Sequence, residues 1–153
     1  KSHTERKGGR MASAQGNLIA FETALDQRGI RYQEMEDSKI PALRIGYSLS
    51  NIDHLDVYFW FDDIGTTLHY ATGVITHVPE DKTDVGLRAV NQLNVQYRWL
   101  SFYLDSDNDV LANADAIILQ DVVGDQCYEL LQRAINVTDE AYAVLMKAIW
   151  GSD

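Results

Sequence analysis

Three aspartates at alternate positions, Asp105, Asp107 and Asp109, are the closest approach of this chain to a metal-binding motif. A calcium loop takes oxygen ligands at alternate positions and also needs a glycine at position six and a glutamate at position twelve. Counted from Asp105, those positions hold Val110 and Ala116. Because Asp and Asn also favour tight turns, we predict a hairpin turn here rather than a metal site.

Three histidines, His54, His69 and His77, are the other candidate metal ligands. A zinc site needs three or four ligands that converge in space. His69 and His77 are eight residues apart, which corresponds to about 26 Å along an extended strand. They cannot bind one ion together on a regular strand, so we predict structural or solvated histidines and no metal.

Cys127 is the single thiol of the chain. A reactive cysteine needs a lowered pKa, whereas its acidic neighbours Asp125 and Glu129 would raise the pKa. Asp62 and Asp63 are adjacent and would face opposite sides of a strand, so they cannot flank one substrate as a carboxylate pair. The chain has no phosphate-binding loop, nucleophile elbow or metalloprotease helix. We therefore predict no catalytic residue, no cofactor and no enzymatic activity.

The elements that carry these residues follow from the spacing of apolar positions. Between residues 54 and 63, apolar residues alternate strictly with polar and aromatic ones, as in a half-buried strand. Helices are predicted at 13–28, 80–97 and 124–150, and strands at 30–36, 42–50, 54–63, 66–78, 98–105 and 110–120. Poor helix formers at 136–138 favour a break in the last helix.

The predicted order of elements is α-β-β-β-β-α-β-β-α. Short turns between consecutive strands favour antiparallel pairing. Helices at both ends of the chain can cover one face of the resulting sheet. The sequence therefore predicts an α+β fold with two layers.

Four aromatic residues are predicted on the other face of that sheet. Tyr58 and Trp60 lie opposite the apolar positions of the third strand, and Trp99 and Tyr103 do the same on the fifth strand. Amphipathic aromatics on an open surface are typical of protein contacts. The alternative is a second small core that the middle helix or the loops cover.

The charge and composition exclude several classes of partner. The formal net charge is −10; the first ten residues carry +3, which leaves −13 on the rest. Such a chain repels phosphate backbones and anionic lipid surfaces, so we expect neither nucleic acid nor membrane as a partner. No apolar run approaches the roughly 20 residues of a membrane span. A lone cysteine suits a reducing cytoplasm.

The chain is expected to contain one domain. Residues 1–12 begin with a polar, basic stretch that lacks apolar residues, and we interpret them as a flexible arm or cloning remnant. Residues 13–153 have the length of a single domain that buries its own core without disulfides.

The stretch from Asn91 onward resembles the YbjN family of small bacterial proteins. Asn91 and Asn94 match paired asparagines at the end of the family's middle helix, and Phe102 and Leu104 match the strand that follows. Residues 105–110 match the next turn, with Asn-Asp where Asp-Gly is often found. The resemblance is clearest over residues 84–150 and weaker over 13–80.

The resemblance implies the fold of type III secretion chaperones and a regulatory rather than enzymatic role. Such chaperones are acidic homodimers that hold extended client segments on hydrophobic patches and sheet edges. We therefore expect a cytoplasmic, homodimeric protein-binding module, chaperone-like or regulatory, that contacts a protein client through Tyr58, Trp60, Trp99 and Tyr103. The alternative is a small-ligand sensor with a pocket between the sheet and the middle helix.

Overall fold

The computed structural model describes residues 12–151, so the predicted arm at residues 1–12 lies, apart from Ala12, outside the described residues. The helices are α2 (Ala14–Gln27), α3 (Thr83–Gln96) and α4 (Val123–Trp150). The strands are β1 (Gln33–Glu34), β2 (Ala42–Tyr47), β3 (Leu55–Phe61), β4 (Thr67–Thr72), β5 (Thr76–His77), β6 (Ser101–Leu104) and β7 (Asp109–Ile117). Two short 3-10 turns, Glu80–Lys82 and Gln120–Val122, precede α3 and α4.

All strands form one antiparallel sheet in the order β1-β2-β3-β4-β7-β6, and β5 continues along β7 beyond β4. The predicted α+β architecture and order of elements are confirmed. The strand expected at 66–78 is divided into β4 and β5, which are separated by Gly73–Ile75.

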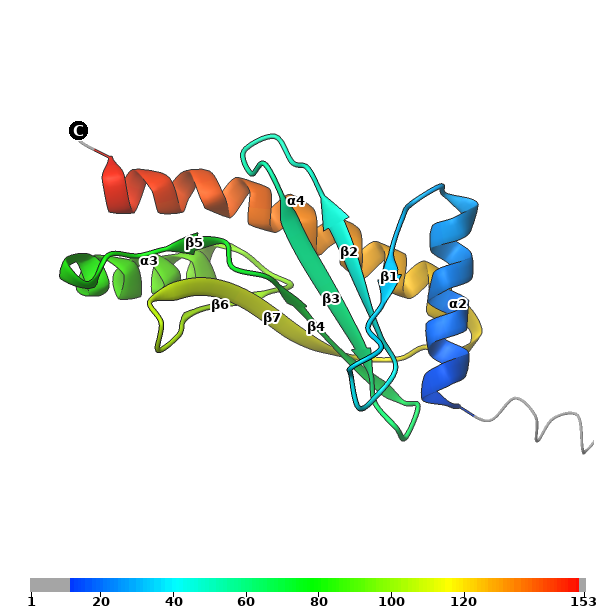
Figure 1. Cartoon of the computed structure of the whole chain (residues 1–153). Coiled ribbons are helices and arrows are strands. Elements are labelled where there is room, and N and C mark those ends of the chain that lie inside the picture. Colours follow the sequence, from blue (N-terminus) through cyan, green and yellow to red (C-terminus); the bar gives the residue numbers. More distant parts are fainter. Residues whose placement is uncertain (1–11, 152–153) are drawn as a thin grey trace, which may run out of the picture.

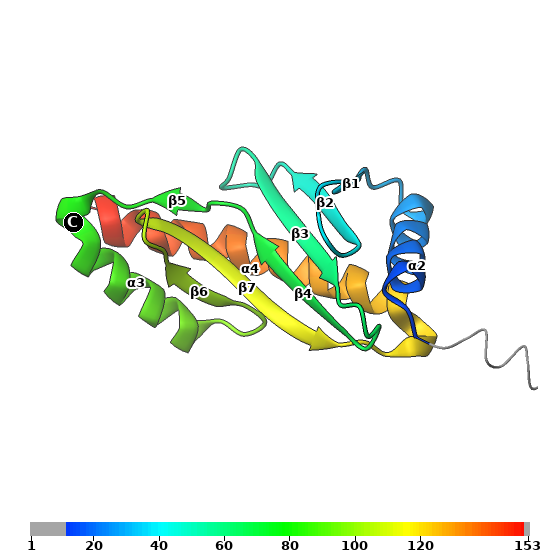
Figure 2. The same ribbon diagram turned by 60° about the horizontal axis from the view of Figure 1, so that its bottom comes forward.

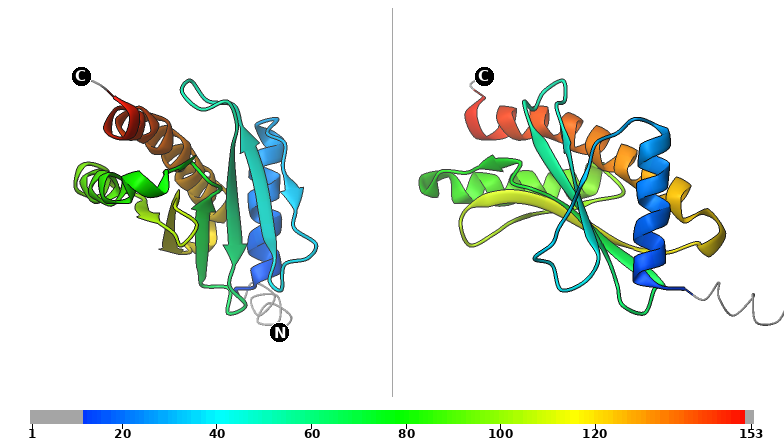
Figure 3. Two further views of the ribbon diagram at one scale, coloured as in Figure 1. Left: turned by 60° about the vertical axis from the view of Figure 1, so that its left-hand side comes forward. Right: turned by 45° about the vertical axis from the view of Figure 1, so that its right-hand side comes forward.

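The three helices form the second layer, and α4 is its longest member. Figure 1 and Figure 2 show α4 running behind the sheet, with α2 near its first residues and α3 near its last. Further views show α3 and the end of α4 side by side (Figure 3). With 28 residues, α4 is about 42 Å long, and it has no break at residues 136–138.

The core lies between the sheet and this helix layer. The inward side chains of β3 are fully buried, and Phe59 lies 4.7 Å from Phe21 of α2 and 5.4 Å from Tyr70 of β4, measured between ring centroids. Lys82, just before the first residue of α3, connects the start of that helix to the end of α4. Its Nζ donates to the carbonyl of Ile149 at 2.7 Å and lies over the Trp150 ring.

Candidate protein-contact surface

The face of the sheet opposite the helices carries the outward side chains of β3. In the register of the sheet, Tyr58 is opposite Ala71 and Trp60 is opposite His69. Successive residues of a strand point to opposite faces, and the buried residues of β3 take the inward positions. Tyr58 and Trp60 therefore lie on the outer face, as their positions in the sequence predict.

Three of the four predicted aromatic residues come together on this face. The rings of Tyr58 and Trp60 stack with centroids 5.6 Å apart, and the Trp60 ring lies 5.5 Å from that of His69. Tyr103 reaches the same region from β6, opposite Leu111 of β7. These residues share a depression of about 580 Å³ that is lined by Met35, Tyr58, Trp60, Val74, Tyr103 and Leu111.

The outer face is not covered by any helix of residues 12–151. Helices α2 and α4 pack against the inner face of β3, while α3 packs against β6 and α4. Tyr103 is 39% exposed and Val74 is 52% exposed, whereas Tyr58 and Trp60 are half-buried by their neighbours on the sheet. We use the name outer aromatic face for Tyr58, Trp60, His69, Val74, Tyr103 and Leu111.

Trp99 is placed differently from the prediction. It lies in the loop before β6, with a positive φ of 80°, and β6 begins two residues later. The Arg133 guanidinium of α4 lies 4.4 Å from the centre of its ring, and its carbonyl accepts a hydrogen bond from the Tyr70 hydroxyl. The backbone turns toward the helix layer here, so Trp99 does not join the outer aromatic face.

Ionised and polar groups border the aromatic residues. His69 Nδ1 lies 2.8 Å from a carboxylate oxygen of Asp115, and His54 Nε2 lies 2.9 Å from one of Asp56. Arg44 of β2, which is opposite Tyr58 in the register, hydrogen-bonds the side chain of Gln33. An apolar centre with a polar border is the usual composition of a protein-contact surface.

Two carboxyl groups meet where α2 packs near the edge strand β1. Burial, followed by the hydrogen bond and charge of Glu34 and by the charge of Asp26, raises the pKa of Glu22 from 4.5 to about 7. The protonated form of Glu22 is therefore favoured in the folded state. Its contribution to stability is complete below pH 4.5 and is lost as the pH rises through about 7.

The Glu22→Gln variant should therefore lose part of the pH dependence of stability. We expect the wild-type melting temperature to fall between pH 4.5 and 7 relative to that of the variant, because only the wild type ionises this carboxyl. Thermal unfolding followed by circular dichroism over this range measures the difference. Asp37→Asn, which removes an exposed charge, is the control, and parallel profiles for wild type and Glu22→Gln would contradict the prediction.

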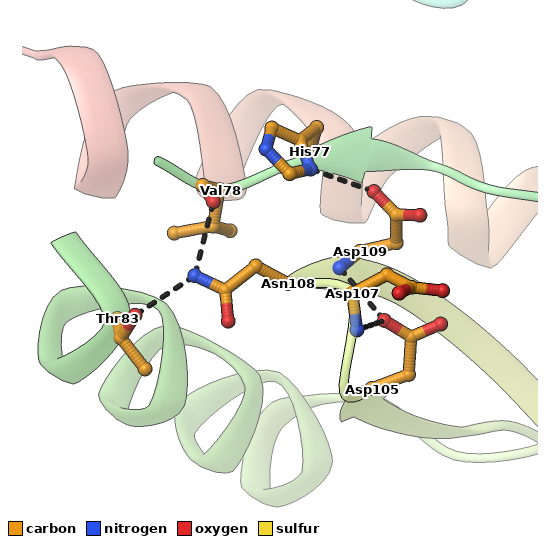
Figure 4. Close-up of polar contacts among 7 residues, drawn as sticks. All are labelled: His77, Val78, Thr83, Asp105, Asp107, Asn108 and Asp109. Atoms are coloured by element: carbon orange, nitrogen blue, oxygen red, sulfur yellow. Dashed lines mark hydrogen bonds and ion pairs between the residues drawn. The ribbon is translucent and has the colours of Figure 1, made fainter. Parts of the chain in front are cut away.

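The aspartates at 105–109 form the turn between β6 and β7 (Figure 4). The Asp105 carboxylate accepts hydrogen bonds from the N–H groups of Asp107 and Asp109 at 2.9 Å. Asn108, with a φ of 61°, donates from its side chain to the carbonyl of Val78 and to the hydroxyl of Thr83. The carboxylates of Asp105, Asp107 and Asp109 lie within 4.8 Å of one another. The hydrogen bonds of Asn108 connect this turn to the residue after β5 and to the start of α3.

The two asparagines at the end of α3 have different roles. Asn91 is exposed. Asn94 donates through Nδ2 to the carbonyl of Phe102 at 3.0 Å and accepts the Phe102 N–H through Oδ1 at 2.7 Å. Its amide thus takes the place of a neighbouring strand at the free edge of β6. The sequence alone did not reveal this role.

Cys127 is fully buried in the helix layer. Burial raises the pKa of its thiol from 9.0 to about 12. The thiol therefore stays protonated at neutral pH and packs as a small apolar side chain, as the sequence predicts.

A family model matches residues 18–146, which is most of the chain. The chain belongs to the YbjN family. The description of that family is "putative bacterial sensory transduction regulator". The match includes the strands of the outer aromatic face and the end of α3, where Asn94 closes the edge of β6.

Solved structures share the fold of this YbjN-family chain. YbjN of E. coli, described as "a putative transcription regulator", has a TM-score of 0.61 and 14% identity over 85% of this chain and 89% of its own. A chain of the ExsC–ExsE complex has a TM-score of 0.58 and 16% identity, over 93% of this chain and 100% of its own. A chain of the ExoU–SpcU complex, from the type III secretion system of Pseudomonas aeruginosa, has a TM-score of 0.53 and 15% identity. The match covers 85% of this chain and 98% of its own.

No curated protein matches the sequence of this YbjN-family chain. Among residues 12–151, no helix combines the length and the apolar character that a membrane crossing requires.

Proposed function

We propose that this chain is a non-enzymatic, protein-binding module, chaperone-like or regulatory, that holds a protein client on its outer aromatic face. The observation that carries the proposal is the stack of Tyr58 and Trp60 beside Tyr103 on a sheet face that no described helix covers.

The chemistry of the face suits a polypeptide segment. Tyrosine and tryptophan offer large apolar area together with a polar group, and they dominate the energetics of protein contacts. The depression of about 580 Å³ has room for apolar side chains. The net charge of −10 favours a client segment with basic residues, because opposite charges accelerate encounter.

The solved relatives support a protein partner by analogy. ExsC with ExsE and SpcU with ExoU are complexes of two proteins. Their identity to this chain is 14–16%, and a function lies in a particular site rather than in a fold.

We further propose a homodimer in the cytoplasm. Helix α3 exposes Leu87 and Val95, which are 48% and 83% exposed, on its side away from the core. Apolar side chains in these positions suit a contact between two copies. The buried, protonated thiol of Cys127 suits a reducing compartment. Sedimentation equilibrium of the wild type and of a Leu87→Ser, Val95→Ser variant measures the oligomeric state.

The double variant Trp60→Ser, Tyr103→Ser should lose its client and keep its fold. Both side chains lie on the outer face and contribute little to the core, so we expect at least tenfold weaker capture with an unchanged circular dichroism spectrum. The measurement compares wild type and variant as baits in a lysate of the source organism. Ile64→Ser, which removes a 78% exposed side chain from the β3–β4 loop, is the control.

Two results would contradict this assignment. An unfolded double variant would show that the two aromatics belong to a core, and equal capture by both baits would show that the client binds elsewhere. A client captured by wild type and Ile64→Ser, and lost only from the folded double variant, identifies the outer aromatic face as its site.

The alternative of a small-ligand sensor has less support. Near the start of α3 the packing is close, since a Cβ at Gly86 would lie 3.1 Å from a methyl carbon of Val78. A metabolite at a hundred times its dissociation constant would stabilise the protein by about 2.7 kcal/mol. Such stabilisation, with no protein client, would favour the sensor.

A further inference from the structure

A separate depression lies over the first strands of the sheet, where β1, β2 and β3 are neighbours. Its volume is about 410 Å³, which is within the range of small-molecule sites, about 300–1,000 Å³. The side chains that give it a distinctive chemistry belong to Arg31, Gln33, Arg44, His54 and Asp56, and Gly46 completes the lining.

The register of the sheet explains why these residues share one face. Arg44 of β2 is opposite Gln33 of β1, and Gly46, two residues later on β2, is opposite Asp56 of β3. Residues at alternate positions of a strand point to the same face. Ile45, which lies between Arg44 and Gly46, is fully buried in the core. Arg44 and Gly46 are therefore on the outer face of the sheet.

Gly46 allows the imidazole of His54 to approach the strand beside Arg44. A Cβ at Gly46 would lie 2.9 Å from Cε1 of His54 and 3.3 Å from a carboxylate oxygen of Asp56, so a larger residue would displace the ring. Asp56 accepts a hydrogen bond from His54 Nε2 at 2.9 Å. The one carboxylate in the lining is thus directed to the imidazole and not to an arginine.

The two arginines of this depression keep their positive charge in an acidic chain of net charge −10. Among residues 12–151, no ion pair includes Arg31 or Arg44, whereas Arg28 and Arg133 each pair with a carboxylate. Arg44 instead donates to the uncharged side-chain oxygen of Gln33. Planar guanidinium groups match the oxygen atoms of a phosphate. The local charge therefore suits a phosphate, although the net charge of the chain does not.

A second depression adjoins the first along β1. Its volume is about 930 Å³, and it shares Arg44 with the first depression and adds Met35 and Tyr58. Tyr58 is opposite Arg44 in the register, so an aromatic ring lies beside the guanidinium. The acidic residues of this second lining are Glu34, Glu36 and Asp37. Because these carboxylates repel anions, a phosphate is confined to the arginine end and an uncharged, aromatic group suits the Tyr58 end.

We propose that the two depressions together bind a small aromatic phosphate monoester. Its phosphate would lie between Arg31, Arg44 and His54, and its ring would contact Tyr58. The ligand is a small molecule bound on the outer face of the sheet and away from α3, so the proposal goes beyond the function proposed above and does not rest on it. Since Tyr58 also belongs to the outer aromatic face, the bound ligand would change one border of that face.

Phenyl phosphate is the probe, titrated into the full chain at physiological ionic strength. We expect saturable shifts of the amide signals of Gln33 and Gly46 in NMR spectra. Arg44→Ala should weaken binding about tenfold or more, because it removes charge-assisted hydrogen bonds to the phosphate. Arg88→Ala, which removes an exposed arginine of α3, is the matched control, since it changes the net charge equally and should bind as the wild type does.

Three further measurements keep the test decisive. If Arg44→Ala fails to fold, Arg31→Ala should weaken binding in the same way. Inorganic phosphate should bind several-fold more weakly than phenyl phosphate, because it has no ring to contact Tyr58. The outer-face double variant proposed above should keep its affinity for phenyl phosphate. No saturable binding to the wild type, equal binding by a folded variant of either pocket arginine, or an equal loss in Arg88→Ala would overturn the proposal.

Discussion

Replacing Phe59 with alanine is expected to reduce the free energy of unfolding by about 3–5 kcal/mol, as for a buried aromatic side chain that leaves a cavity. Phe59 is fully buried and packs between Phe21 of α2 and Tyr70 of β4. The ring thus joins the helix layer to two strands at once. Since domains have a total stability of about 5–15 kcal/mol, this variant should be close to unfolding. Urea denaturation followed by circular dichroism measures the loss.

Trp60→Ala is the matched control, because Trp60 is the next residue on the same strand and faces the opposite side. Its ring contacts only the outer-face neighbours Tyr58 and His69 among the aromatic residues. We expect a loss of about 1 kcal/mol, typical of a side-chain pair on an exposed sheet face. Equal losses for the two variants would show that both faces of β3 are covered, which contradicts the single helix layer.

Asn94→Ala is expected to destabilise the protein by about 1–3 kcal/mol, because two hydrogen bonds to the backbone of Phe102 are lost together. A second consequence is expected in solution. Without the amide of Asn94, β6 presents an unpaired N–H and C=O at a sheet edge, and such edges pair with other chains. The variant should therefore also aggregate more readily, as measured by light scattering during thermal unfolding.

Asn91→Ala separates this effect from a general effect on α3. Asn91 is one turn earlier on the same helix and is exposed, and alanine is the better helix former. The stability of the Asn91→Ala variant should therefore equal that of the wild type or be slightly higher. If Asn91→Ala lost as much stability as Asn94→Ala, the hydrogen bonds to Phe102 could not be the cause.

The order of elements and the two-layer fold could be predicted because local patterns specify them. In β3 the alternation of apolar residues with polar and aromatic ones sets both the strand and its buried face. Tyr58 and Trp60 could be assigned to the outer face for the same reason. The neighbours that complete this face, such as His69 and Val74, depend on strand register, which the sequence of one strand does not contain.

Other features depend on contacts between distant segments. Trp99 continues the alternating pattern of β6, but its backbone has a positive φ and its ring lies under Arg133 of α4. Residues 136–138 are poor helix formers, yet α4 continues through them because Thr138 is fully buried and Asn51 hydrogen-bonds Asp139 from the β2–β3 loop. Tertiary burial outweighs intrinsic helix propensity at such positions.

The position of α4 at residues 123–150 determines when the protein can fold during synthesis. The inner face of β3, including Val57 and Phe59, depends on α4 for part of its cover, and α4 is translated more than sixty residues after β3. A ribosome that has made only the sheet therefore carries an exposed apolar surface, a form of chain that aggregates readily. Folding of this sheet must wait for its last helix, and the growing chain is most vulnerable during that interval.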